Sequence, residues 1–183
     1  MRSPMKKPLY ATVLLALALS ACSKRAPEEN RELPESPDES RPTVTLTPDL
    51  SIPSTSPVTE EVIERYAATE HAVVRHILIS WGEKAPAYSF RGGQDPRGEV
   101  RSREEANRLV HALIARFNKG IEFEVLMKDF SEDRGSAATG RAYTATPTAS
   151  LTAPFRDMAL RLNPGETGVV ETDFGYHIML RTE

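Results

Sequence analysis

The sequence contains a single cysteine, Cys22, among its 183 residues. A disulfide within the chain is therefore excluded, and so is a metal site built on clustered cysteines. The four histidines never take the His-x-x-x-His spacing that places two ligands on one helix face, and the Gly-x-Ser-x-Gly turn of serine hydrolases is absent. We therefore expect no metal centre and no resident cofactor.

Long apolar runs are scarce as well, and the run at residues 9–19 is too short for a comfortable membrane-spanning helix. Three basic residues within positions 2–7 precede it, and the small-residue sequence Leu19-Ser20-Ala21-Cys22 follows it. These are the three regions of a secretory signal peptide. The cysteine at the processing site resembles the lipobox of bacterial lipoproteins, which implies removal of residues 1–21 and acylation of Cys22.

The mature chain has a deficit of positive charge. Removing three of the 23 basic residues with the signal peptide leaves 20 against 26 acidic ones, a formal charge of −6. Nucleic acid is therefore not an expected partner, because phosphate binding needs clustered Lys and Arg. Ser23 follows the cysteine, as in enterobacterial lipoproteins sorted to the outer membrane, so we expect a lipid-anchored, periplasm-facing protein on the outer rather than the inner membrane.

Large apolar residues are almost missing from residues 22–58, which carry seven prolines and many acidic and hydroxyl side chains. Such a segment cannot bury enough surface to offset its ordering entropy, so a lipidated, disordered linker is expected. Residues 59–72 then predict a short helical lead-in, with Thr59 as its N-cap and Val62, Ile63 and Tyr66 on one side.

Residues 73–183 remain for one compact domain. A helix is predicted between the capping box at Ser102 and the stop at Gly120, and loops are predicted over residues 81–100 and 131–136. The other predicted elements are strands at residues 73–80, 141–145, 167–171 and 176–181, and helices at residues 123–130 and 151–162. This order predicts an α+β fold, a small sheet covered by helices.

Two histidines stand inside apolar runs of strand character, His76 in the first predicted strand and His177 in the last. An imidazole is a poor choice there unless something needs it. One such histidine would most often be a satisfied core residue, whereas two on strands that can be neighbours indicate a paired site. His111 lies outside the apolar stripe of its helix and is expected to be exposed and without a special role.

Five motifs occur in order along residues 73–183: Arg75-His76-Ile77-Leu78-Ile79, Gly120-x-x-Phe123-x-x-Leu126, Phe130-Ser131-Glu132-Asp133, Phe155 and Phe174-Gly175-Tyr176-His177-Ile178. Together they resemble the parvulin-type peptidyl-prolyl isomerase domain. The resemblance implies a four-stranded antiparallel sheet surrounded by about four helices, with the active groove on one side of the sheet. It also implies that the two histidines are the family's pair on the central strands.

The resemblance assigns roles to further residues. The implied catalytic set is His76, Asp133, Thr172 and His177. The apolar slot for the substrate proline is expected from Tyr143, Leu151, Phe155, Phe174 and Met179. The histidines would set the hydrogen-bond network beneath the groove, and Asp133 would act through the polarity of the site.

The sequence also departs from the family. Gly140-Arg141-Ala142-Tyr143-Thr144 stands where many bacterial members have Gly-Gly-x-Leu-Gly, so two glycines are lost and the slot gains a ring with a polar tip. Ser80 stands where phosphate-directed members carry a lysine, so a preference for phosphoserine-proline is not expected. Arg91 and Arg97 either favour an acidic residue before proline or belong to a solvated charged loop.

We therefore expect a monomeric prolyl isomerase that assists the folding of exported polypeptides in the bacterial cell envelope. It would act without covalent chemistry, by binding the twisted X-Pro amide better than the planar forms. Its partners would be unfolded or partly folded proline-containing polypeptides, and the membrane through the lipid. The alternative is a catalytically weak holdase or assembly factor that uses the same groove, its activity blunted by the departures at residues 140–144.

Overall fold

The computed structural model of the protein describes residues 51–67, 69–84 and 95–183. All of them belong to the unit Thr45–Glu183, the second of two units in the chain. The predicted signal peptide, Cys22, most of the predicted linker and Arg91 lie outside the described residues. Across the described ranges, every helix falls short of the length and apolar character that a membrane span requires.

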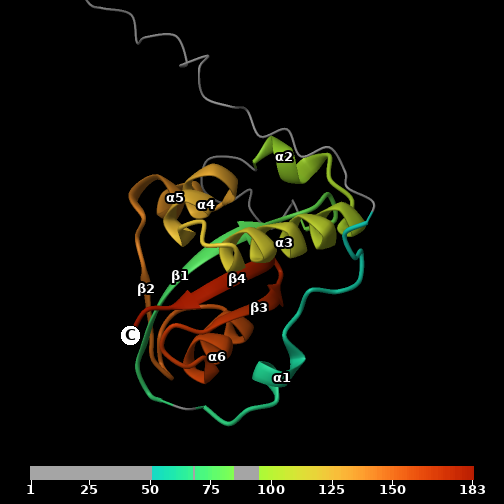
Figure 1. The fold of residues 1–183 in the computed structure, drawn as a ribbon. Coiled ribbons are helices and arrows are strands. Elements are labelled where there is room, and N and C mark those ends of the chain that lie inside the picture. Colours follow the sequence, from blue (N-terminus) through green and yellow to red (C-terminus); the bar gives the residue numbers. More distant parts are fainter. Residues whose placement is uncertain (1–50, 68, 85–94) are drawn as a thin grey trace, which may run out of the picture. The chain divides into compact units, whose positions relative to one another are not determined.

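Four antiparallel strands form one sheet in the order β2-β1-β4-β3 (Figure 1). They are β1 (Ala72–Ile79), β2 (Tyr143–Ala145), β3 (Thr167–Thr172) and β4 (Gly175–Arg181). Each begins and ends within two residues of its predicted bounds, and the predicted four-stranded antiparallel sheet is confirmed. The first and last strands in the chain, β1 and β4, are therefore central neighbours.

Alternation along β1 and β4 gives the sheet two apolar faces. Ile77, Ile79, Tyr176 and Ile178 lie on one face and form a core cluster with the apolar sides of two helices. These helices, α3 (Arg103–Asn118) and α4 (Phe123–Phe130), lie together across that face (Figure 1). The capping box that opens α3 is present, since Ser102 accepts from the Glu105 amide and the Glu105 carboxylate accepts from the Ser102 amide.

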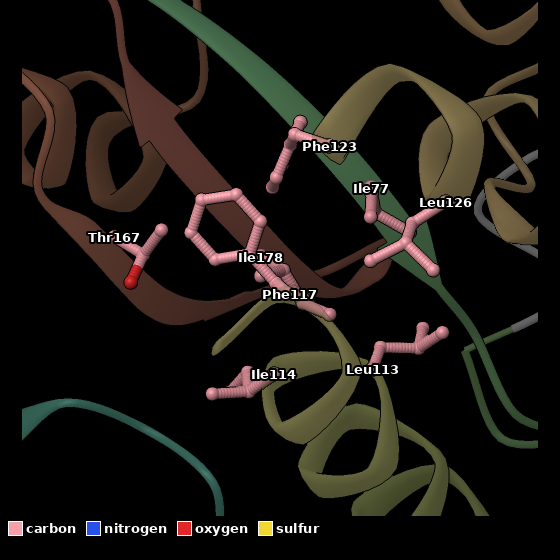
Figure 2. A pocket seen from close by; sticks show the side chains of 8 residues that line it. All are labelled: Ile77, Leu113, Ile114, Phe117, Phe123, Leu126, Thr167 and Ile178. Carbon is pink, nitrogen blue, oxygen red and sulfur yellow. The ribbon is translucent and has the colours of Figure 1, made fainter. Parts of the chain in front are cut away.

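A small cavity lies inside this layer, between α3, α4 and the sheet. Figure 2 shows the rings of Phe117 and Phe123 and the side chain of Ile178 around it. Its volume is about 10 Å³, room for about one water, whereas ligand sites span several hundred Å³. We regard it as a packing gap in the core.

The opposite face of the sheet carries Val74, Met179 and the two strand histidines. It is covered by α6 (Ala153–Arg161), with α1 (Glu60–Ile63) packed beside it. A Cβ at Gly168 would lie 3.0 Å from both Met158 Sδ and Leu162 Cδ2. The absence of that side chain lets α6 approach β3 closely.

The lead-in is shorter than predicted. The helix α1 ends at Ile63, and Tyr66 is 97% exposed, so its predicted place on an apolar side was wrong. Thr59 is the N-cap residue, as predicted, but its side chain makes no capping hydrogen bond. It instead exchanges hydrogen bonds with Val169, donating from its amide to the carbonyl at 3.0 Å and accepting the Val169 amide on Oγ1 at 3.0 Å. The edge strand β3 thereby gains a backbone partner.

The chain just before α1 packs on the domain, so the predicted disorder of the linker was wrong for residues 54–58. Asn107 of α3 donates to the Ser54 carbonyl at 2.6 Å, and His111 Nε2 lies 3.2 Å from the Thr55 carbonyl. Pro57 is buried and Val58 packs against the α3 side of the core. His111 is therefore partly buried and has a partner, contrary to its prediction.

Two short helices occur where loops were predicted, so the described residues hold six helices rather than about four. They are α2 (Pro96–Glu99) and α5 (Arg134–Thr139). Asp95 caps α2 by accepting from the Arg97 amide, and the Arg97 guanidinium bonds the same carboxylate and the carbonyls of Asp129 and Ser131. Arg97 thus holds α2 in place and is not a free cation in a solvated loop.

Candidate active site

His76 and His177 meet on the face of the sheet that α6 covers. His177 pairs with Leu78 in the β1–β4 register, and His76 lies two residues before Leu78, so the histidines are diagonal neighbours on one face. Their Nδ1 atoms are 2.9 Å apart, and the rings stack with an interplanar angle of 21°. Both residues are buried. The structure therefore brings together the two histidines that the sequence predicts to pair.

Asp133 extends this contact, since its Oδ2 lies 2.9 Å from His76 Nε2. The segment 131–133 is fastened to the end of β1. Ser131 Oγ accepts the Leu78 amide at 3.1 Å, and the Glu132 amide donates to the Leu78 carbonyl at 2.9 Å. These hydrogen bonds between β1 and the segment 131–133 hold the Asp133 carboxylate against the His76 imidazole.

The Asp133 carboxylate is surrounded by donors. Its Oδ2 accepts the hydroxyls of Ser136 and Tyr143, each at 2.7 Å, in addition to His76. Burial alone would raise the pKa of this carboxyl, but the hydrogen bonds from His76, Ser136 and Tyr143 outweigh it and hold the pKa well below its ordinary value. Asp133 is also the N-cap of α5, with Oδ1 3.5 Å from the Ser136 amide. It is thus both a cap and a member of the site.

Thr172 stands at the other end of the network. Its Oγ1 lies 2.8 Å from His177 Nε2 and accepts the Phe174 amide at 3.1 Å. The turn that allows this depends on Gly175, whose φ is +130° and where a Cβ would collide with the Ile79 carbonyl oxygen of β1. Glycine is required there so that the start of β4 can lie against β1.

These contacts tie the directions of the hydrogen bonds to one another. An ionised Asp133 only accepts, so His76 Nε2 carries a proton. Burial and the neighbouring His76 keep the pKa of His177 well below its usual value, so His177 is neutral. A His76 ring that carries its single proton on Nε2 accepts at Nδ1 from His177 Nδ1, and His177 Nε2 then accepts the Thr172 hydroxyl proton. The bonds then run in one direction, from the Phe174 amide to the Asp133 carboxylate.

Aromatic rings enclose the histidine pair. The Phe155 ring of α6 meets His76 and His177 edge-to-face, with centroids 5.2 and 5.1 Å away. Tyr143 meets His76 in the same way at 5.1 Å and Phe155 at 5.8 Å. Leu151 is partly buried against the core cluster to which Phe155 belongs. The structure therefore places two of the predicted slot residues, Tyr143 and Phe155, beside the histidines, with Leu151 on the same core cluster as Phe155.

The other two predicted slot residues differ in exposure. Met179 is fully buried in the core cluster on the same face of the sheet as the histidines, so it has no surface to offer a substrate, and its predicted contact was wrong. Met179 lies opposite His76 in the β1–β4 register, so its side chain faces α6. Phe174 is partly buried in the β3–β4 turn, where its amide binds Thr172.

Sequence reasoning missed two members of the network. Ser136 is fully buried and bonds Asp133, and its signal was the Asp-x-x-Ser spacing of a helix N-cap. Arg141 donates to the Tyr143 hydroxyl at 2.9 Å, and its signal was its position two residues away on the same side of an extended segment. Within the described residues, no group of three or more His, Cys, Asp or Glu side chains is arranged to hold a metal ion.

Comparison with known proteins identifies relatives of this domain. The family model of the PPIC-type PPIase domain matches residues 61–183. The chaperone SurA of Pseudomonas savastanoi pv. phaseolicola is 34% identical over 107 residues, which are 58% of this chain and 21% of SurA. The foldase protein PrsA of Geobacillus kaustophilus is 36% identical over 70 residues, which are 38% of this chain and 25% of PrsA.

Solved structures include the same fold. The peptidyl-prolyl isomerase ESS1 from Candida albicans superposes with a TM-score of 0.53 at 25% identity, covering 62% of this chain and 63% of that one. The matched part of the two curated relatives is a quarter or less of their length. The family model, in contrast, spans more than half of this chain. The chain therefore belongs to the PPIC-type peptidyl-prolyl isomerase family, the parvulins.

Proposed function

We propose that this protein is a peptidyl-prolyl cis-trans isomerase and that its catalytic residues are His76, Asp133, Thr172 and His177. One observation carries the proposal: the two histidine Nδ1 atoms lie 2.9 Å apart in a hydrogen-bonded chain that ends on Asp133. An apolar core does not need a buried chain of hydrogen-bonded polar groups for its stability. The presence of such a chain beside Phe155 therefore indicates a functional site.

The chemistry needs no covalent step. The barrier to X-Pro rotation is ~18–20 kcal/mol because the amide has partial double-bond character. Lowering it requires better binding of the twisted amide than of either planar form. In our proposal the proline ring packs on Tyr143 and Leu151, with Phe155 as the base of the slot, and the adjoining carbonyl lies near Asp133.

The ionised Asp133 contributes through its charge. Twisting the amide removes resonance and with it part of the negative charge on the carbonyl oxygen. A fixed negative charge near that oxygen therefore disfavours the planar amide relative to the twisted one. The bonds from His76, Ser136 and Tyr143 keep the carboxylate ionised and fixed, and Thr172 and His177 orient His76.

We further propose that the substrates are exported polypeptides and that the protein is a monomer anchored to the bacterial envelope. Relatives named chaperone and foldase support polypeptide substrates. The signal-peptide pattern of residues 1–21 and the lipobox-like Cys22 support export and acylation, and Ser23 favours the outer membrane. Residues 22–53 would then serve as a tether between lipid and domain.

Isomerisation of Ala-Pro peptides in a protease-coupled assay tests the activity. The matched control is Lys119→Ala, which removes an exposed charge at the C-cap of α3, on the other side of the sheet. We expect His76→Ala to abolish most of the acceleration and Lys119→Ala to retain it. If the wild type accelerates no peptide, whatever residue precedes proline, and still binds an unfolded protein, the holdase alternative replaces the enzyme.

Incorporation of a labelled fatty acid in a Gram-negative host tests the anchor. The wild type should take up the label and fractionate with the outer membrane, and Cys22→Ser should do neither. Label in both proteins, or in neither, would contradict acylation at Cys22.

A further inference from the structure

Arg141 is an exposed cation at the edge of the site. Its guanidinium carbon lies 4.7 Å from the centroid of the Tyr143 ring, and its Nη2 donates to the Tyr143 hydroxyl at 2.9 Å. That hydroxyl donates in turn to Asp133 Oδ2 at 2.7 Å. The stacking and the hydrogen bond together hold the Arg141 charge close to the candidate catalytic carboxylate of Asp133, with only the Tyr143 hydroxyl between them.

Other arginines near this end of the domain are paired with carboxylates. Arg101 meets Glu132 at 2.6 Å, Arg97 meets Asp95 at 2.8 Å and Arg75 meets Glu124 at 3.0 Å. Arg141, by contrast, forms no ion pair within 4.0 Å with any carboxylate of residues 51–67, 69–84 and 95–183. Its two contacts fix its position and leave its charge available to a ligand.

The charge lies within reach of a bound peptide. Tyr143 forms the side of the aromatic cluster around His76 and Phe155, and Arg141 covers the face of that ring. A residue next to the substrate proline has its Cα only 3.8 Å from the proline Cα. A carboxylate on that neighbouring residue can therefore reach the guanidinium while the proline ring packs on Tyr143.

We propose that Arg141 is a specificity-determining residue that favours an acidic side chain next to the substrate proline. The inference rests on the proposed function and adds the substrate class to it. Asp133 does not cancel this preference, because its charge is partly buried and already takes up three donors, whereas Arg141 is exposed. An exposed pair of this kind changes kcat/KM by about two- to fivefold and weakens as salt is added.

The test compares four peptides, with Glu-Pro, Pro-Glu, Ala-Pro and Lys-Pro at the centre, on the full-length protein with and without Arg141→Ala. We expect the wild type to prefer one of the two glutamate peptides over Ala-Pro by about two- to fivefold at low salt. Arg141→Ala should bring that ratio to about 1, and Arg141→Glu should bring it below 1. Lys119→Ala, which also removes one positive charge, should leave the ratio unchanged.

The result that overturns the inference is a ratio near 1 in the wild type, or a preference that Arg141→Ala retains. Failure of the proposed function is a different result, no acceleration of any of the four peptides. The peptides are then compared by fluorescence anisotropy. Tighter binding of a glutamate peptide that Arg141→Ala removes supports the role of Arg141, and equal binding of all peptides contradicts it.

Discussion

His76 Nδ1 and His177 Nδ1 lie 2.9 Å apart, so only one of the two atoms carries the proton between them. The tautomer of each ring is therefore tied to the state of the other. If His76 gained a second proton, its Nδ1 would become a donor, and His177 would have to move its own proton to Nε2. The hydrogen bond between His177 and Thr172 would then reverse its direction. Protonation of His76, which contacts Asp133, therefore changes the hydrogen bonding of Thr172 at the β3–β4 turn.

Removal of the Thr172 hydroxyl tests this coupling. Thr172→Val keeps the shape but leaves the buried Nε2 of His177 without a partner, which should cost about 1–3 kcal/mol of stability. We expect kcat/KM for Ala-Pro peptides to fall by about tenfold, equivalent to ~1.4 kcal/mol. Thr172→Ser retains the hydroxyl and should stay within about twofold of the wild type, on the same scale. Equal kcat/KM in the valine and serine variants would show that the hydroxyl has no part in catalysis.

The stability of the domain should depend on pH through His177. Its pKa is lowered in the folded state by burial and by His76, from a usual value of 6.5. Below pH 6.5 the unfolded state binds a proton that the folded state does not, so stability is complete above 6.5 and is lost as pH falls towards the lowered pKa. The expected loss is up to ~1.4 kcal/mol for each pH unit below 6.5.

Urea unfolding between pH 7.5 and 5.5 measures this loss, with His177→Asn as the comparison. Asparagine forms hydrogen bonds but does not titrate, so the variant should be less stable than the wild type at pH 7.5 and should lose less stability on acidification. Parallel pH profiles for the two proteins would assign the acid sensitivity to other groups.

Much of the fold was predictable because its signals are local. The capping box at Ser102, the apolar period of α3 and the alternation of the four strands each follow from a few neighbouring residues. The helix α5 was missed because its sequence, RGSAAT, has no apolar period, and its cap at Asp133 becomes evident only beside Ser136. The packing of residues 54–58 was missed because it depends on polar contacts to α3 distant in sequence.

The site was predictable to a similar extent. A histidine inside an apolar strand is unusual, so His76 and His177 could be found from the sequence. The role of the Tyr143 hydroxyl could not, because the bond to Asp133 joins residues ten positions apart across a helix and a turn. Met179 illustrates the converse error, since an apolar residue near a predicted slot can as well be fully buried in the neighbouring core.

The buried ion pair between Arg101 and Glu132 should be important for stability. The two side chains meet at 2.6 Å with 12% and 3% exposure, and Glu132 also accepts the Ser80 amide. Burial raises the pKa of Glu132 despite the opposing effect of Arg101. Arg101→Met should therefore destabilise the domain by about 3–5 kcal/mol, since it leaves a buried carboxylate without its partner.

Urea unfolding measures that change, with Arg134→Met as the control. Arg134 is 62% exposed on its side chain and lies 3.8 Å from Asp95, so its loss should alter stability by less than about 1 kcal/mol. Similar losses of stability in the two variants would mean that the buried Arg101–Glu132 pair contributes no more to stability than the exposed pair of Arg134. The segment carrying Glu132 also carries Asp133, so Arg101→Met should lower isomerase activity as well.

Gly175 should be the least replaceable glycine of the domain core. Its φ of +130° is strained for any other residue, and a Cβ would collide with the Ile79 carbonyl oxygen and lie 2.9 Å from Ser80 Cα. Both obstacles are main-chain atoms of the sheet region and cannot rotate away. Gly175→Ala must therefore separate β4 from β1 at the turn, and we expect a loss of about 3 kcal/mol or more.

Gly120→Ala separates strain from collision. Gly120 has a φ of +92°, but nothing lies within 4 Å of the position its Cβ would take, so the expected loss is only about 1–2 kcal/mol. Thermal unfolding of both variants gives the two values. Because the Gly175 turn also holds Thr172 against His177, its alanine variant should lose isomerase activity even at temperatures where it remains folded. An unchanged rate in folded Gly175→Ala would mean that the turn does not position Thr172 for catalysis.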